Sequence, residues 1–114
     1  MGISSTSSAQ SPFNDRVDAL LSAIEDAVDR WSDAIDVDIE RSGNVLTLTL
    51  ESGQKLIVNS QQANEEVWVA ARLGGFHYRW DDAGQCWTDT RSGEDLKAAL
   101  ARLTEAEAGA PLVI

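Results

Sequence analysis

The sequence predicts an α+β fold in which two helices cover one face of an antiparallel sheet of about six strands. Three observations lead to this prediction: a helical apolar pattern at residues 12–31, short alternating segments between residues 35 and 90, and a second helical stretch after residue 92. The order of helix, strands and helix favours both helices on the same side of the sheet. With 114 residues and no internal repeat, the chain should form one domain.

The first helix is the strongest signal in the sequence. Ser11 should cap it, and Pro12 suits the first helical position, where its missing N–H is not needed. Apolar residues then recur on one helical face, at Val17, Leu20, Leu21, Ile24, Val28 and Trp31. Residues 1–11 are rich in Ser and polar residues, so we expect them to form a disordered N-terminal tail.

The apolar period then changes to two, which is typical of strands. Ile35, Val37 and Ile39 alternate with Asp36, Asp38 and Glu40 and predict a half-buried first strand. Alternation and β-propensity predict further strands at residues 45–50, 55–59, 67–71, 76–80 and 86–90. Short turn sequences such as Ser42-Gly43-Asn44 separate these segments, so consecutive strands should pair as an antiparallel meander.

The second helix should begin near Ser92 and carry Leu96, Leu100 and Leu103 on one face. The apolar residues 110–114 are too few to form an element, and we expect them to pack in a groove. The predicted organisation is a tail at 1–11, a folded domain at 12–106 and a C-terminal tail at 107–114.

The composition excludes several classes of partner and site. Asp and Glu number 19 against 9 Lys and Arg, and the net charge of -10 argues against binding to nucleic acid or anionic membranes. The single cysteine, Cys86, excludes an internal disulfide, and the single histidine, His77, excludes a histidine cluster. We expect Cys86 to be a buried strand thiol, and we expect a non-enzymatic protein of the reducing cytoplasm.

The acidic residues are concentrated in one segment. Residues 15–40 hold nine acids and two bases, a net charge of -7. Asp26, Asp29 and Asp33 should project from one side of the first helix, and the strand acids Asp36, Asp38 and Glu40 share one face. Carboxylates favour hard cations such as Mg²⁺, Ca²⁺, Mn²⁺ and Fe³⁺, with Fe²⁺ tolerated, although an exposed ridge should bind them weakly. The alternative is a solvated surface that only aids solubility.

Aromatic and amide residues form a second unusual set, on the predicted sheet. Alternation places Trp68 on the face opposite Val67 and Val69, where an exposed Trp would serve as an interface anchor. Trp87, in a polar strand, is expected in the core. His77 is compatible with an ordinary polar strand position or with a contact surface.

Several motifs in order resemble the bacterial frataxin family, in its CyaY branch. They are Asn44-Val45-Leu46-Thr47-Leu48, Ile57-Val58-Asn59-Ser60-Gln61, Val67-Trp68-Val69-Ala70, Gly74-Gly75-Phe76-His77-Tyr78, Trp87 and Arg91-Ser92-Gly93-Glu94. The resemblance covers about residues 13–106 and implies an α-β sandwich, which agrees with the order of elements above. The sequence departs from the family pattern at Ala63, where Pro is usual, and at Arg30 and Ser32, where acids are common. The loop 81–85 is also longer than expected.

The resemblance also implies a function in iron–sulfur cluster assembly, together with a cysteine desulfurase and a scaffold protein. It implies weak iron binding, and docking on the basic face of the desulfurase, through Glu25, Asp26, Asp29, Asp33, Asp36, Asp38 and Glu40. Asn59, Gln61 and Trp68 match the sheet positions that contact partners, and we add His77 to them. The implied protein is a monomer that regulates cluster formation when iron is available; iron donation and iron-dependent oligomers stay open.

Two other functions are compatible with the same residues. Paired carboxylates could act as a ferroxidase that oxidises Fe²⁺. The acidic surface could instead be an interaction module that is indifferent to metal.

Overall fold

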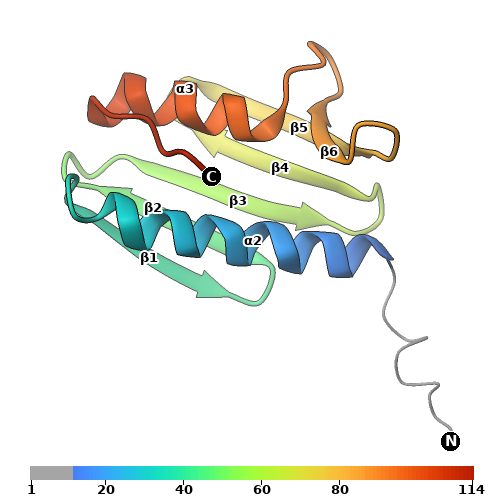
Figure 1. The fold of residues 1–114 in the computed structure, drawn as a ribbon, viewed down its shortest axis with the longest axis horizontal. Coiled ribbons are helices and arrows are strands. Elements are labelled where there is room, and N and C mark those ends of the chain that lie inside the picture. Colours follow the sequence, from blue (N-terminus) through green and yellow to red (C-terminus); the bar gives the residue numbers. More distant parts are fainter. Residues whose placement is uncertain (1–11) are drawn as a thin grey trace, which may run out of the picture.

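Two helices lie on one face of a six-stranded antiparallel sheet in the computed structural model, which describes residues 12–114 (Figure 1). The elements are α2 (Pro12–Trp31), β1 (Val37–Ser42), β2 (Val45–Leu50), β3 (Lys55–Gln61), β4 (Glu66–Ala71), β5 (Gly74–Asp81), β6 (Cys86–Asp89) and α3 (Leu96–Ala108). The predicted fold class is therefore confirmed. The predicted tail and the Ser11 cap fall in residues 1–11, outside the described part of the chain.

The sheet is a meander in which each strand pairs with its neighbours in the chain. Alternation along β2 turns Leu46, Leu48 and Leu50 toward the helices, and each is at most 4% exposed. β1 and β6 form the two edges. The opposite face of the sheet carries no helix within the described residues (Figure 1). The alternate strand positions on that face hold mainly polar residues, such as Thr47, Thr49 and Asn59.

The predicted face of the first helix is confirmed. The six apolar residues that define it are all buried, and Phe13 and Ala27 join them. Neither described helix is long and apolar enough to cross a membrane.

Several predicted boundaries were wrong: β3 continues to Gln61, β5 already begins at Gly74, and the starts of the first strand and of the second helix differ as well. The first strand begins at Val37 and not at Ile35, because the backbone after α2 turns tightly and the N–H of Ile35 donates to the Trp31 carbonyl at 3.0 Å. Ile39 faces the helix side, but it is 38% exposed because β1 is an edge strand. The second helix begins at Leu96 and not near Ser92, because the Asp95 carboxylate accepts from the Ala98 N–H and caps it.

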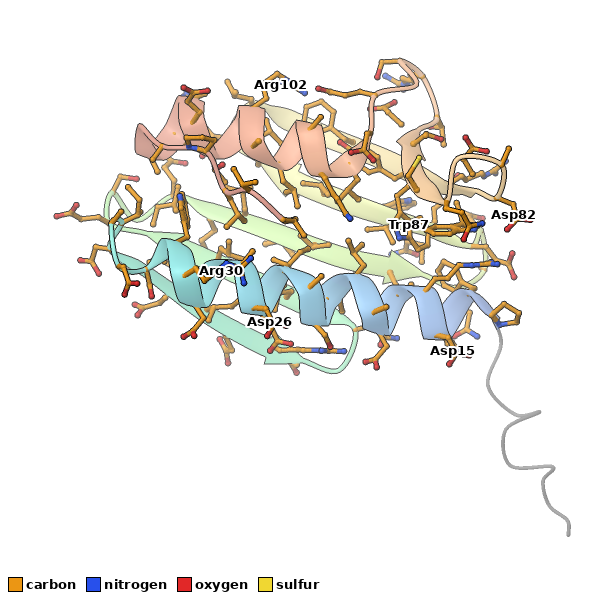
Figure 2. The ribbon with its side chains drawn as sticks, viewed as in Figure 1. Asp15, Asp26, Arg30, Asp82, Trp87 and Arg102 are labelled. Atoms are coloured by element: carbon orange, nitrogen blue, oxygen red, sulfur yellow. The ribbon has the colours of Figure 1, made fainter. Side chains whose placement is uncertain are left out.

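The core fills the space between the layers, and Trp87 belongs to it as predicted, at 5% exposed. Its ring meets Phe13 and Trp80 edge to face, at centroid distances of 5.9 and 5.5 Å, and Figure 2 shows it beside the N-terminal half of α2. Cys86 is free, as a lone cysteine must be within one chain, but it is half-buried and not buried as predicted.

The C-terminal segment runs back between the two helices, in agreement with the prediction that it packs in a groove (Figure 1). Leu112 is 1% exposed, and its N–H donates to the Thr104 hydroxyl at 2.8 Å. The Thr104 hydroxyl donates in turn to the Leu100 carbonyl, so α3 holds the segment in place.

Candidate functional site

The acids of α2 lie on its outer side, away from α3, as Figure 2 shows at Asp15 and Asp26. Asp26 and Asp29 are exposed and have no ion-pair partner within residues 12–114. Asp33 is exposed too, but it lies in the turn after α2 and not on the helix as predicted, because α2 ends at Trp31. Three carboxylates therefore follow the last turns of α2 and the chain beyond it.

The acids of the first strand lie on the other face of the sheet from the acids of α2. Asp38 and Glu40 belong to β1 and stand across from Thr49 and Thr47 of β2, on the face without helices. Asp36 precedes the strand and is exposed. We call the exposed acids between residues 26 and 40, none of which has an ion-pair partner in the described chain, the free ridge: Asp26, Asp29, Asp33, Asp36, Asp38 and Glu40.

Glu25, which the resemblance includes in the iron ridge, is already paired. The guanidinium of Arg41 on β1 donates to Glu25 Oε1 at 3.0 Å and to Asp18 Oδ1 at 2.7 Å. The hydrogen bond to Asp18, together with that to Glu25, raises the pKa of Arg41 above its ordinary value. Sequence reasoning missed this arrangement because Arg41 is remote in the chain from both acids.

The free ridge has the chemistry of a surface for exchangeable cations. Among the described residues, no three His, Cys, Asp or Glu side chains converge in the way a preformed metal site requires. Exposed carboxylate oxygens attract hard cations, and water completes the coordination of such ions. Repulsion between neighbouring like charges is relieved when a cation or a basic surface approaches.

The open sheet face carries a different kind of surface, centred on Trp68. As alternation predicts, Trp68 lies opposite Val67 and Val69, which are each 1% exposed. Its indole stacks on the imidazole of His77, with ring centroids 4.3 Å apart and an angle of 7° between the planes. Asn59 is the cross-strand neighbour of Trp68 on β3, so Asn59, Trp68 and His77 form one row across three strands.

A buried carboxylate, which sequence reasoning missed, organises this face. Glu66 is 7% exposed, and its two oxygens accept from Trp68 Nε1 at 2.9 Å and from Arg79 Nε at 3.1 Å. His77 Nδ1 lies 3.8 Å from the same oxygen as the indole. We call these four residues the Glu66 cluster; Gln61 of β3 pairs beside it, across from Glu66.

Only the strand register reveals this cluster. Glu66 and Arg79 stand directly across from each other on β4 and β5, although 13 positions separate them in the chain. A Glu at the start of an apolar strand gives no signal of burial by itself, since Glu is rarely buried unless it is paired.

Comparison with known proteins adds the family. The family model of the frataxin-like domain matches residues 6–110, which is most of the chain. The chain belongs to the frataxin-like family. Its relatives include the iron–sulfur cluster assembly protein CyaY of Bordetella petrii, which is 54% identical over 72 residues; the match covers 63% of this chain and 64% of that protein. The protein of the same name from Cupriavidus necator is 47% identical over 100 residues, which cover 88% of this chain and 84% of the relative.

Solved frataxin structures share the fold. Frataxin from Psychromonas ingrahamii superposes with a TM-score of 0.80 at 33% identity, over 89% of this chain and 92% of that one. The trimeric frataxin of Saccharomyces cerevisiae, described as complexed with ferrous iron, has a TM-score of 0.70 at 25% identity; the match covers 80% of this frataxin-like chain and 83% of the yeast chain.

Proposed function

We propose that this protein is an iron-binding regulator of iron–sulfur cluster assembly in the cytoplasm, which docks its free ridge on the basic face of a cysteine desulfurase. The observation that carries the proposal is the free ridge. Between residues 26 and 40 the chain has six acids and only Arg30 as a base, and none of these acids is paired within the described chain. The names of the Bordetella and Cupriavidus relatives and the ferrous iron of the yeast relative support the pathway and the metal.

The proposed mechanism is electrostatic. Iron is bound weakly as cargo or signal, because single exposed carboxylates and water hold it and no enclosed site is needed. The same carboxylates steer the protein toward a basic partner and contribute most to the association rate. Bound iron lowers the negative charge of the ridge, so iron and the partner are coupled through the same residues.

The open sheet face supplies the second contact. Trp68 and His77 offer a stacked aromatic pair, and Asn59 and Gln61 offer amide groups for hydrogen bonds beside it. Such a surface suits the scaffold protein as a short-range contact, because aromatic residues in packed positions dominate interface energies. In this arrangement the ridge attracts one partner while the sheet contacts another.

The decisive test is a pull-down of purified cysteine desulfurase by this protein, with and without Fe²⁺ under anaerobic conditions. The matched variant carries Asp26→Asn, Asp29→Asn and Asp33→Asn, which preserve size and remove three charges. We expect the wild-type protein to retain the desulfurase and the variant to lose most of the binding. Equal retention of both would contradict the proposal, and retention that a chelator or added iron leaves unchanged would identify a metal-indifferent module.

An amide NMR titration with Fe²⁺ locates the metal. Signals of residues 26–40 should broaden first, because the iron is paramagnetic and close to them. Broadening confined to Trp68 and His77 would exclude the ridge as the metal surface. Oxygen consumption with repeated turnover would instead establish a ferroxidase, whereas we expect no turnover.

A further inference from the structure

Arg41 divides the acidic surface into two unequal parts. Its guanidinium reaches from β1 to two acids of α2 that are seven residues, about two helical turns, apart, at distances of 2.7 Å and 3.0 Å. The Arg41 side chain is 24% exposed, whereas Asp18 and Glu25 are 72% and 39% exposed. A half-buried cation therefore lies against two carboxylates that water can reach.

We propose that Arg41 is a specificity-determining residue. It is a built-in counter-ion that occupies the carboxylates of Asp18 and Glu25, so external cations bind at the free ridge and not at these two acids. This inference rests on the proposed function of the ridge and adds a residue that controls it. It also assigns Glu25 a role different from that of an iron ligand.

Position explains why Arg41 can do this. It lies on the helix-facing side of β1, together with Val37, which packs against the core. The strand holds the base of the side chain in place, so an external cation competes with a guanidinium whose freedom is already reduced. Two charge-assisted hydrogen bonds from a planar group are stronger than the contact of a solvated point charge.

A positive charge in this acidic region is not sufficient for such pairing, as Arg30 shows. Arg30 lies on the same acidic helix and is exposed, but it has no hydrogen bond or ion pair to an acid within residues 12–114. Figure 2 shows it on α2 beyond Asp26. Arg30 and Arg41 carry the same charge in the same acidic region, so exchanging each for Gln isolates the effect of the pairing.

The test measures Mn²⁺ binding to the folded full chain, by the broadening of backbone amide NMR signals. In the wild-type protein, Mn²⁺ should broaden residues 26–40 strongly and residues 17–19 much less. In Arg41→Gln, broadening at Asp18 and Glu25 should increase about threefold or more at the same Mn²⁺ concentration. In Arg30→Gln, which changes the net charge equally, these two residues should behave as in the wild-type protein.

Two further variants keep the result unambiguous. Adding Asp18→Asn and Glu25→Gln to Arg41→Gln should abolish the added broadening, which shows that these carboxylates hold the metal. If Arg41→Gln does not fold, as judged from its amide spectrum, Arg41→Lys decides: a Lys cannot bridge both acids in the same planar way, so broadening should increase at one of them.

Equal broadening at Asp18 and Glu25 in the wild-type protein and Arg41→Gln would overturn the inference, as would an equal increase in Arg30→Gln. The proposed function fails separately, if Mn²⁺ and Fe²⁺ leave residues 26–40 of the wild-type protein unchanged. In that case an increase at Asp18 and Glu25 in Arg41→Gln would still support the role of Arg41.

Discussion

The free ridge and the Glu66 cluster place carboxylates in opposite circumstances. In the free ridge the acids are exposed and have no ion-pair partner in the described chain. In the Glu66 cluster the carboxylate is 7% exposed and both oxygens accept hydrogen bonds. The difference is that carboxylates without partners remain accessible to charges from outside the molecule, whereas a buried carboxylate with partners holds its neighbouring side chains in place.

The largest effect should come from Glu66→Ala. The change leaves Arg79 and the Trp68 indole without their acceptor, and we expect the free energy of unfolding to fall by about 1–3 kcal/mol. Urea denaturation measures this, and the Trp68 indole N–H signal should move. Glu51→Ala is the control, because Glu51 is exposed and unpaired in the described chain, and it should cost less than about 0.5 kcal/mol. Equal losses in the two variants would show that the cluster is not a structural unit.

The next largest effect should come from removing charges of the free ridge, which should weaken partner binding without the loss of stability expected for Glu66→Ala. The variant with Asp26→Asn, Asp29→Asn and Asp33→Asn should bind desulfurase about tenfold more weakly, a change of about 1.4 kcal/mol. Its unfolding free energy should stay constant or increase by a few tenths of a kcal/mol, because like-charge repulsion is removed. Calorimetric titration and denaturation measure both. A loss of stability similar to that of Glu66→Ala would remove the distinction between the two regions.

Binding at the free ridge and binding at the open sheet face should differ in their dependence on salt. Raising the ionic strength from about 0.1 M to about 1 M shortens the Debye length from about 10 Å to about 3 Å. Binding that depends on the free ridge should weaken over this range, and the gap between the wild-type protein and the triple Asn variant should narrow. The effect of Trp68→Ala on scaffold binding should change little. A common salt dependence of both interactions would contradict the division of labour.

The smallest effect at neutral pH should come from Tyr78→Phe. Tyr78 is fully buried, and its hydroxyl has no hydrogen-bond partner among residues 12–114, so its removal should change stability by less than about 0.5 kcal/mol. Comparison with Glu66→Ala then shows that lost partners, and not burial alone, cause the larger cost.

At alkaline pH, the ionisation of Tyr78 should affect the free energy of unfolding. Burial raises the pKa of Tyr78 to about 12 from its ordinary value of 10.0. The unfolded chain therefore loses the phenolic proton first, and the wild-type protein should lose stability as pH rises from about 10 to about 12. Tyr78→Phe should lack this part of the pH dependence. Parallel curves for the two proteins would contradict the assignment.

The sequence predicted most of the fold because local patterns suffice for it. The apolar face of α2 and the alternation in β2 each depend on neighbouring residues, and both were confirmed. The errors lie at ends of elements: residues 32–35 bend back on the helix, and α3, capped by Asp95, begins at Leu96 and not near Ser92. These depend on backbone hydrogen bonds that propensities do not contain.

For the candidate site, the sequence by itself determined which acids are concentrated in one segment and that Trp68 faces away from Val67. Only the tertiary structure decided which of these charges are free. Arg41 neutralises Asp18 and Glu25 across the α2–β1 boundary, and Arg79 satisfies Glu66 across two strands. The physical reason is that pairing depends on distance in space, and the sheet register and the packing of α2 set that distance.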